Sequence, residues 1–307
     1  MRSAVSAPEA AGFGQPQDAV SPVFQKLSAL LELTKPRVNF LVVLTAAAGY
    51  YMGSAHPFSF SLFLATLFGT ALVAGGSAAL NQYMERELDA RMPRTSRRPL
   101  PSGRLASLSA LLFGLALIVL GTLTLAMMVN GLTALLGLIT AFLYLLVYTP
   151  LKTRTALCTT VGAIPGAMPP LMGWTGAQGV ISTESLVLFL ILLFWQFPHF
   201  LAISWAYKTD YQEGGFSMLS GADPTGRRTA VRIAAYTVAL IAISFVPTLM
   251  NLTGALYLAG AGLLALYLLV FGIRAVVERS RKSARGLSFA TIVYLPILLV
   301  LMILDKA

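Results

Sequence analysis

Three side chains able to bind a metal ion recur every four residues in the segment 81–89. Asn81, Glu85 and Asp89 supply one amide and two carboxylates. On a helix this spacing returns each residue to nearly the same side, so the three side chains share one face roughly 12 Å long. Magnesium is usually held by a few such oxygen ligands together with substrate phosphates. The spacing therefore indicates a magnesium site, although the charged end of an ordinary helix would have the same pattern.

Arginine is concentrated around the same segment, at positions 86, 91, 94, 97 and 98. A guanidinium group can hold a phosphate through two parallel hydrogen bonds. A diphosphate leaving group also needs divalent cations to neutralise its charge as the carbon–oxygen bond breaks. Carboxylates for the metal beside arginines for the phosphate oxygens are therefore suited to a magnesium ion and a diphosphate.

The composition assigns the chain to a class of protein. Hydrophobic residues make up 57% of the chain and charged residues only 11%, which is far from the balance of a soluble domain. A membrane-spanning helix needs about 20 predominantly apolar residues. The sequence thus predicts an all-α polytopic membrane protein with about nine transmembrane helices, at approximately 38–55, 60–83, 107–128, 131–149, 156–175, 185–206, 230–250, 253–273 and 287–304.

Lysine and arginine are unequally divided between the two sides that alternating spans would create. One side, which includes the N-terminal tail with Lys35 and Arg37, holds 21 of the 22 basic residues, and the other holds only Lys306. The positive-inside rule predicts a cytoplasmic N-terminus and an external C-terminus. The net charge of +10 is then a signal of topology and of anionic phosphates, so we predict no nucleic-acid partner.

The first 25 residues differ from the rest of the chain. They are rich in Ala, Pro, Ser, Gly and Gln and lack an apolar core, so we expect a disordered tail over 1–25 and a single transmembrane domain over 26–307. The tail resembles neither a signal peptide nor an arginine-rich transit peptide, which favours a bacterial inner membrane. The single cysteine, Cys158, excludes an intramolecular disulfide.

A second group of acids follows the sixth predicted span. Asp210 and Glu213 precede Gly214-Gly215, a pair that predicts a helix end near Glu213. The loops 84–106 and 207–229 follow spans of the same orientation. We therefore expect their acids to face each other across a central cavity open to the cytoplasmic side, with an isoprenoid tail between the helices and its head group at the interface.

Longer runs of sequence lie along nearly the whole chain. They are Leu33-Thr-Lys-Pro-Arg-Val38, Asn81 through Asp89, Arg94-Thr-Ser-Arg-Arg-Pro-Leu-Pro-Ser-Gly-Arg104, Tyr148-Thr-Pro-Leu-Lys-Thr-Arg-Thr155, Val161-Gly-Ala-Ile-Pro-Gly-Ala-Met-Pro-Pro-Leu-Met-Gly-Trp174, Trp195-Gln-Phe-Pro-His-Phe200 and Tyr207-Lys-Thr-Asp-Tyr211. With these runs the chain resembles the UbiA-type intramembrane prenyltransferases, whose first signature is N-x-x-x-D-x-x-x-D. The Gly-Ala-Ile-Pro-Gly-Ala and Trp-Gln-Phe-Pro-His-Phe runs resemble the branch that acts on haem rather than its quinone-making relatives.

The resemblance implies a reaction. Members of this branch transfer a farnesyl group from farnesyl diphosphate to the 2-vinyl group of haem b, with magnesium helping the diphosphate to leave, and give haem O. The vinyl group would attack an allylic cation or a cation-like transition state, and water would quench the resulting cation as a hydroxyl. The implied partners are the two substrates, the lipid bilayer, and a haem A synthase or the assembly of a terminal oxidase.

The resemblance also implies roles for individual residues. Catalytic roles fall on Asn81, Glu85, Asp89 and Asp210, and magnesium binding on the same four with Glu213. Glu85 departs from the family pattern, which has aspartate there, so the oxygen that binds the metal is open. Substrate-binding roles fall on Arg94, Arg98, Tyr148, Lys152, Arg154, His199, Lys208 and Tyr211. The basic residues among them are expected to bind the diphosphate or the haem propionates, and their division between these anions is open.

His199 lies about two helical turns, roughly 12 Å, inside its predicted span. An ionisable residue at such a position is usually functional, and a haem substrate suggests an axial ligand or a porphyrin contact. The alternative is a structural bond to a backbone carbonyl freed by Pro198.

Two other functions stay open on the sequence. A prenyltransferase of the same superfamily that acts on 4-hydroxybenzoate or another aromatic acceptor would share the acidic motif but not the haem-branch runs. A membrane transporter would use broken helices and buried acids. A transporter predicts functional charges near the middle of the bilayer, whereas here they gather at one interface.

Overall fold

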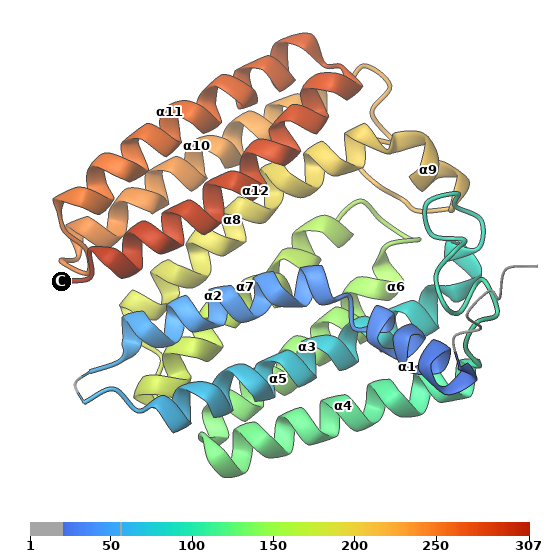
Figure 1. Cartoon of the computed structure of the whole chain (residues 1–307). Helices are drawn as coiled ribbons and strands as arrows, with labels where there is room; N and C mark the ends of the chain where they lie inside the picture. Colours follow the sequence, from blue (N-terminus) through green and yellow to red (C-terminus); the bar gives the residue numbers. More distant parts are fainter. Residues whose placement is uncertain (1–20, 56) are drawn as a thin grey trace, which may run out of the picture.

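The structure, a computed structural model, describes residues 21–55 and 57–307 and is built there from helices (Figure 1). They are α1 Pro22–Leu33, α2 Pro36–Gly53, α3 Phe60–Asp89, α4 Ser107–Met128, α5 Gly131–Phe142, the π-helix η1 Leu143–Tyr148, α6 Thr149–Leu151, α7 Cys158–Gln178, α8 Thr183–Ala206, α9 Lys208–Glu213, α10 Arg227–Leu249, α11 Ala255–Glu278 and α12 Arg281–Leu304. The all-α prediction is confirmed.

Each predicted apolar stretch coincides with one long helix or, for 131–149, with the continuous run from α5 to α6. Within the described residues, seven of these segments are long and apolar enough to cross a membrane: α3, α4, the run α5 to α6, α8, α10, α11 and α12. These helices identify an integral membrane protein. The count of nine spans and the cytoplasmic N-terminus stay predictions.

The helices α2 and α7 have 18 and 21 residues but are less apolar than the seven candidate spans, and their packing is consistent with this. They cross closely, because a Cβ atom at Gly49 would meet the carbonyl of Pro170 and one at Gly173 would meet the carbonyl of Ala46. Small residues permit such close backbone approach between helices in membranes. At the close interface of α2 and α7, glycine and alanine therefore occupy positions where large apolar side chains would not fit.

The helix α3 is held against α4 by a second interface of the same kind. A Cβ atom at Gly76 would lie 2.6 Å from the Gly114 carbonyl oxygen, and one at Gly121 would lie 2.8 Å from the Gly69 carbonyl oxygen. On each helix the two glycines are seven residues apart and so share one face. This interface fixes the position of α3, whose last turns carry the residues 81–89.

The short helices α1, α6 and α9 lie at the same end of the molecule, and the C-terminus lies toward the opposite end (Figure 1). Loops from distant parts of the sequence meet at the first end. The Ser217 N–H donates to the Lys152 carbonyl at 2.7 Å, and Arg104 forms an ion pair with Glu32 at 2.8 Å. The basic loops therefore gather on one side of the helix bundle, as the charge distribution predicts.

The helical part of the chain begins slightly earlier than the sequence predicts. The helix α1 begins at Pro22, so the last four residues of the predicted tail are helical, while residues 1–20 lie outside the described part of the chain.

An apolar cavity lies between α2, α7, α8 and α12, but its volume is only about 10 Å³. That volume is close to the minimum for one water molecule, so a central cavity of the size of a prenyl chain stays a prediction.

Asp223 joins the loop after α9 to the start of α10. Its Oδ2 accepts hydrogen bonds from the Thr229 backbone N–H at 2.8 Å and from the Thr229 hydroxyl at 2.9 Å. Burial raises the pKa of this carboxyl. The hydrogen bonds from Thr229, Thr225 and Gly226 outweigh burial, and they hold the pKa below its ordinary value of 3.8.

The close contact of α3 with α4 predicts that Gly76→Ala destabilises the protein. The added methyl group has no free space, so we expect the free energy of unfolding to fall by about 1–3 kcal/mol. Thermal unfolding in detergent measures this change. Gly262→Ala on α11 is the matched control, because no heavy atom lies within 4 Å of its new Cβ. Equal melting temperatures for the two variants would contradict the interface.

The hydrogen bonds of Asp223 predict a dependence of stability on pH. Because the pKa is lower in the folded than in the unfolded chain, the contribution is fully present above the unfolded value of 3.8 and is lost as the pH falls through the folded pKa. Asp223→Asn should remove this acid-dependent part and cost about 1 kcal/mol at neutral pH, because the Thr229 hydrogen bonds lose their charged acceptor. Melting temperatures of both proteins between about pH 7 and pH 3 provide the test. Parallel curves for wild type and variant would refute it.

Candidate functional site

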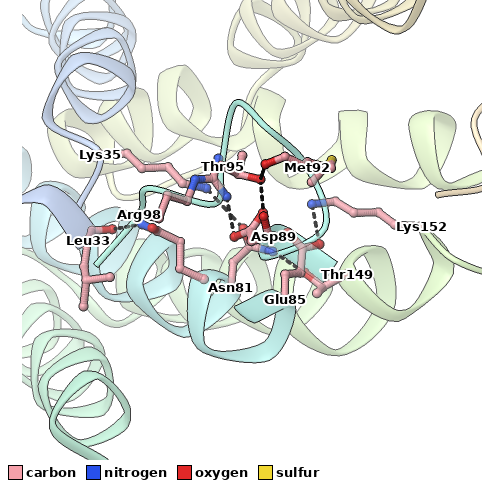
Figure 2. Close-up of polar contacts among 11 residues, drawn as sticks. Leu33, Lys35, Asn81, Glu85, Asp89, Met92, Thr95, Arg98, Thr149 and Lys152 are labelled. Atoms are coloured by element: carbon pink, nitrogen blue, oxygen red, sulfur yellow. Dashed lines mark hydrogen bonds and ion pairs between the residues drawn. The ribbon is translucent and has the colours of Figure 1, made fainter. Parts of the chain in front are cut away.

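The side chains of Asn81, Glu85 and Asp89 lie on one face in the last turns of α3, as their spacing predicts (Figure 2). All three are buried, with exposed fractions of 1%, 5% and 1%. A buried carboxylate is unfavourable unless it is paired or bound to a metal ion. Their burial therefore argues against the charged end of an ordinary solvated helix.

Each carboxylate on this face has a cation from another segment beside it (Figure 2). The Lys152 Nζ, just after α6, lies 2.7 Å from the Glu85 Oε1. The Arg98 Nη1, in the loop after α3, lies 2.6 Å from the Asp89 Oδ2. The structure thus brings Arg98 and Lys152, both predicted to bind substrate anions, into direct contact with the predicted metal ligands.

Asn81 is held between a lysine and a threonine. The Lys35 Nζ donates to the Asn81 Oδ1 at 3.1 Å, and the Asn81 Nδ2 donates to the Thr149 Oγ1 at 3.1 Å. The Thr149 hydroxyl in turn donates to the Tyr144 carbonyl at 2.8 Å, within the π-helical turn η1. Such π-helical turns are frequent at functional sites, and this one fixes the orientation of the amide.

Lys35 contacts the acidic face through Asn81, whereas a basic residue before a first span by itself predicts only topology. Its backbone has a φ of 49° directly before Pro36, a left-handed conformation that is uncommon for a residue other than glycine. Burial, together with the nearby charges of Arg98 and Lys152, lowers the pKa of Lys35 to about 7. The run Leu33 to Val38, which stood out in the sequence, was the available signal.

The loop after α3 is folded back onto the helix that precedes it. The Thr95 hydroxyl donates to the Asp89 carbonyl at 2.8 Å, and the Arg98 N–H donates to the Thr95 carbonyl at 3.0 Å. These bonds form turns that return Arg98 toward Asp89. The position of the arginine is therefore set by local backbone hydrogen bonds as well as by its charge.

The second acidic segment forms the short helix α9. The helix ends at Glu213 with Gly214 as its cap, as the two glycines predict, and Glu213 is exposed while Asp210 is half-buried. Within the described residues, no group of three or more His, Cys, Asp or Glu side chains is placed to hold one metal ion. Metal binding by Asp210 and Glu213 therefore stays a prediction.

The loops after α3 and α8 nevertheless pack on each other. Met92 from the first loop joins Phe216 and Met218 from the second in one buried cluster. The Arg94 guanidinium lies 4.5 Å from the centre of the Tyr211 ring. The two loops thus meet through apolar and cation–π contacts, and the expectation that their acids face each other across a cavity stays a prediction.

Contacts differ among three other predicted substrate-binding residues, Tyr148, Lys208 and Arg154. The Lys152 Nζ is 4.6 Å from the centre of the Tyr148 ring, so Tyr148 belongs to the site. The Lys208 Nζ donates to the Asp223 carbonyl at 3.3 Å and lines a polar cavity of about 110 Å³. Arg154 is exposed.

His199 lies between α8 and α12. Its ring stacks on Trp195 with 4.8 Å between ring centres, and its Nδ1 is 2.8 Å from the Thr291 Oγ1. The Thr291 Oγ1 is also 2.7 Å from the Ser288 carbonyl, and when the hydroxyl donates its one proton there, the Nδ1–H of His199 donates to Thr291. In the neutral ring the Nε2 lone pair is then free. The bonding partner is the Thr291 hydroxyl and not a carbonyl of α8 freed by Pro198.

The buried pair of Glu85 and Lys152 predicts an asymmetric effect of mutation. Lys152→Met leaves a buried carboxylate without its cation and should lower the free energy of unfolding by about 3–5 kcal/mol. The double variant Glu85→Gln/Lys152→Met should recover most of that loss. Thermal unfolding without added metal is the measurement, and Arg86→Gln, which breaks an exposed pair with Glu87, should cost about 0–1 kcal/mol. Failure of the double variant to recover stability would contradict the pairing.

Comparison with known sequences gives consistent results over most of the chain. Residues 42–293 match the UbiA prenyltransferase family. The chain is 47% identical over 285 residues to the protoheme IX farnesyltransferase of Solibacter usitatus, which covers 90% of this chain and 98% of that protein. It is 42% identical over 286 residues to the protoheme IX farnesyltransferase of Koribacter versatilis, with 90% and 92% covered.

Solved structures have the same fold. A structure described as giving insights into digeranylgeranylglyceryl phosphate synthase in membranes matches with a TM-score of 0.77 at 18% identity, over 92% of this chain and 98% of its own. A UbiA homologue from Archaeoglobus fulgidus bound to DMAPP and Mg²⁺ matches with a TM-score of 0.65 at 14% identity, over 89% and 98%. These structural matches show the fold, and the family match over residues 42–293 with the relatives at 42–47% identity shows that the chain belongs to the UbiA prenyltransferase family.

Proposed function

We propose that this protein transfers the farnesyl group of farnesyl diphosphate to the 2-vinyl group of haem b, giving haem O and diphosphate, in the inner membrane of a bacterium. Support for the acceptor comes from relatives such as those of Solibacter usitatus and Koribacter versatilis, which are protoheme IX farnesyltransferases. Support for the chemistry comes from the buried face of Asn81, Glu85 and Asp89 with its surrounding cations. This face is the observation on which the proposal mainly rests.

The residues of this face fit magnesium. Two buried carboxylates and an amide oxygen on one side of a helix are hard oxygen ligands, and magnesium takes few protein ligands beside phosphate oxygens. Glu85 in place of the family's aspartate is compatible with this arrangement, because its longer side chain still reaches Lys152 at 2.7 Å. When bound, magnesium would neutralise charge that develops on the leaving diphosphate.

The cations beside the carboxylates would change partners when substrate binds. Lys152, Arg98 and Lys35 now balance or contact the three oxygen-bearing side chains. If a metal ion were held by those side chains, the same cations would be free to donate to the oxygens of the diphosphate. The exchange keeps charge balanced in both states, so neither the empty nor the loaded site buries an isolated charge.

Aromatic rings stand next to the same centre. The rings of Tyr144 and Tyr148 lie 5.5 Å apart, and Tyr148 is adjacent to Lys152. Their faces would stabilise the allylic cation that forms as the carbon–oxygen bond breaks. The vinyl carbon of haem b then forms the new carbon–carbon bond, and water adds as hydroxyl and releases a proton. On this proposal, the free Nε2 of His199 ligates the haem iron or contacts the porphyrin.

The proposed roles predict that Asp89→Asn abolishes turnover. The amide removes the negative charge of a metal ligand and also leaves Arg98 unpaired, so we expect a loss of at least about 100-fold in kcat, in the range seen when one electrostatic catalytic group is removed. The assay uses purified protein in liposomes with haem b, farnesyl diphosphate and magnesium, and mass spectrometry for the hydroxyethylfarnesyl haem. Glu87→Gln on the exposed side of α3 is the control and should keep activity.

The outcomes of this assay separate the alternatives. Product that depends on magnesium in the wild type and disappears in Asp89→Asn supports both the reaction and the site. Product that persists in Asp89→Asn would refute the metal role of this residue. Turnover of 4-hydroxybenzoate without any product from haem b would refute the haem acceptor and retain the family.

A further inference from the structure

Three arginines converge on the ring of Tyr207, at the end of α8. The guanidinium carbons of Arg94, Arg285 and Arg281 lie 5.2, 5.7 and 5.9 Å from the centre of the ring. Arg94 comes from the loop after α3, whereas the other two come from the first turns of α12. We call these three residues the arginine cluster.

The arginine cluster combines three unfavourable electrostatic features. In the described part of the chain, Arg104 pairs with Glu32 at 2.8 Å and Arg274 pairs with Glu278 at 3.1 Å, but the ion pairs include no member of the cluster. Two cluster members are four residues apart on α12, a spacing at which like charges repel. They also lie at the N-terminus of the helix, where its dipole disfavours positive charge. A bound anion would relieve all three costs.

The arginine cluster is linked to the second acidic segment through Arg94. Arg94 also lies over Tyr211, next to Asp210 on α9. The carboxylates on α3 already have Lys152 and Arg98 beside them. The site therefore has one set of cations at the acidic face and a second set at the ends of α8 and α12.

The same two helices carry His199 and its partner. His199 on α8 is bonded to Thr291 on α12, and Tyr207 follows His199 by eight residues, or about 12 Å along a helix. A flat substrate lying along α8 and α12 could therefore contact His199 near its centre and the arginine cluster at its edge. Haem b, with carboxylates on one edge, has this arrangement of groups.

We propose that the arginine cluster binds the two propionate carboxylates of haem b and orients the porphyrin. Arg281 and Arg285 are then residues that determine specificity for the acceptor. The inference rests on the proposed function, and it divides the basic residues between the two anions. Arg98 and Lys152 face the donor diphosphate, whereas Arg94, Arg281 and Arg285 face the acceptor carboxylates.

The test compares haem b with its dimethyl ester, in which both carboxylates are blocked. Titration followed by haem absorbance gives the Kd of each compound for the wild type and for Arg281→Gln/Arg285→Gln, without farnesyl diphosphate. We expect the double variant to bind haem b at least about tenfold more weakly, the scale of one lost hydrogen bond to a charged group. It should bind the ester as well as the wild type does. In turnover, the KM for haem b should rise and the KM for farnesyl diphosphate should stay unchanged.

A matched control has the same change of charge elsewhere on this end of the molecule. Arg232→Gln/Lys282→Gln alters two exposed basic residues on α10 and α12 that are not among the three cations over the Tyr207 ring, and it should bind haem b like the wild type. Equal weakening in the control would overturn the proposal in favour of general membrane electrostatics. A higher KM for farnesyl diphosphate alone would assign the cluster to the donor and also overturn it. Wild type that binds haem b more tightly than the ester but makes no product would refute the proposed function while supporting the carboxylate site.

Discussion

The buried negative charges on the last turns of α3 need cations beside them, and this need determines how one end of the molecule is arranged. Glu85 and Asp89 are removed from water, and an isolated buried charge costs several kcal/mol. Lys152 and Arg98 meet this cost at 2.7 and 2.6 Å. Because these cations come from the segment after α6 and from the loop after α3, the ion pairs also tie those loops to the helix. The ion pairs that balance the buried charges therefore also hold these loops in place.

The helices beneath this end provide a frame that can hold such charges in place. Close glycine contacts join α3 to α4 and α2 to α7, and helices packed through their backbones have little freedom to shift. In a membrane, where lipid is as apolar as leucine, close packing replaces the hydrophobic effect as the force between helices. The separation into an apolar frame and one charged end suits a substrate with a long apolar chain and an anionic head.

Both substrates of the proposed reaction are anionic, and the proposed sites give each its own set of cations. On that proposal, magnesium and diphosphate would bind the acidic face on α3 together, because its cations would need a new anion once a metal ion took the carboxylates. The second set is the arginine cluster, which forms no ion pair within the described residues, and beside it on α8 is the imidazole of His199, bonded to Thr291. The different charge balance of the two sets provides a physical basis for keeping the donor and the acceptor apart.

The sequence by itself determined the properties that depend on neighbouring residues. Apolar length located the long helices, the four-residue spacing placed Asn81, Glu85 and Asp89 on one face, and two glycines ended α9 at Glu213. Only the tertiary structure decided which distant residues meet that face. Lys35 reaches Asn81 across 46 residues, Thr149 reaches it across 68, and Thr291 reaches His199 across 92. These contacts follow from which helices pack together, and packing depends on the fit of whole surfaces, which no local pattern of residues specifies.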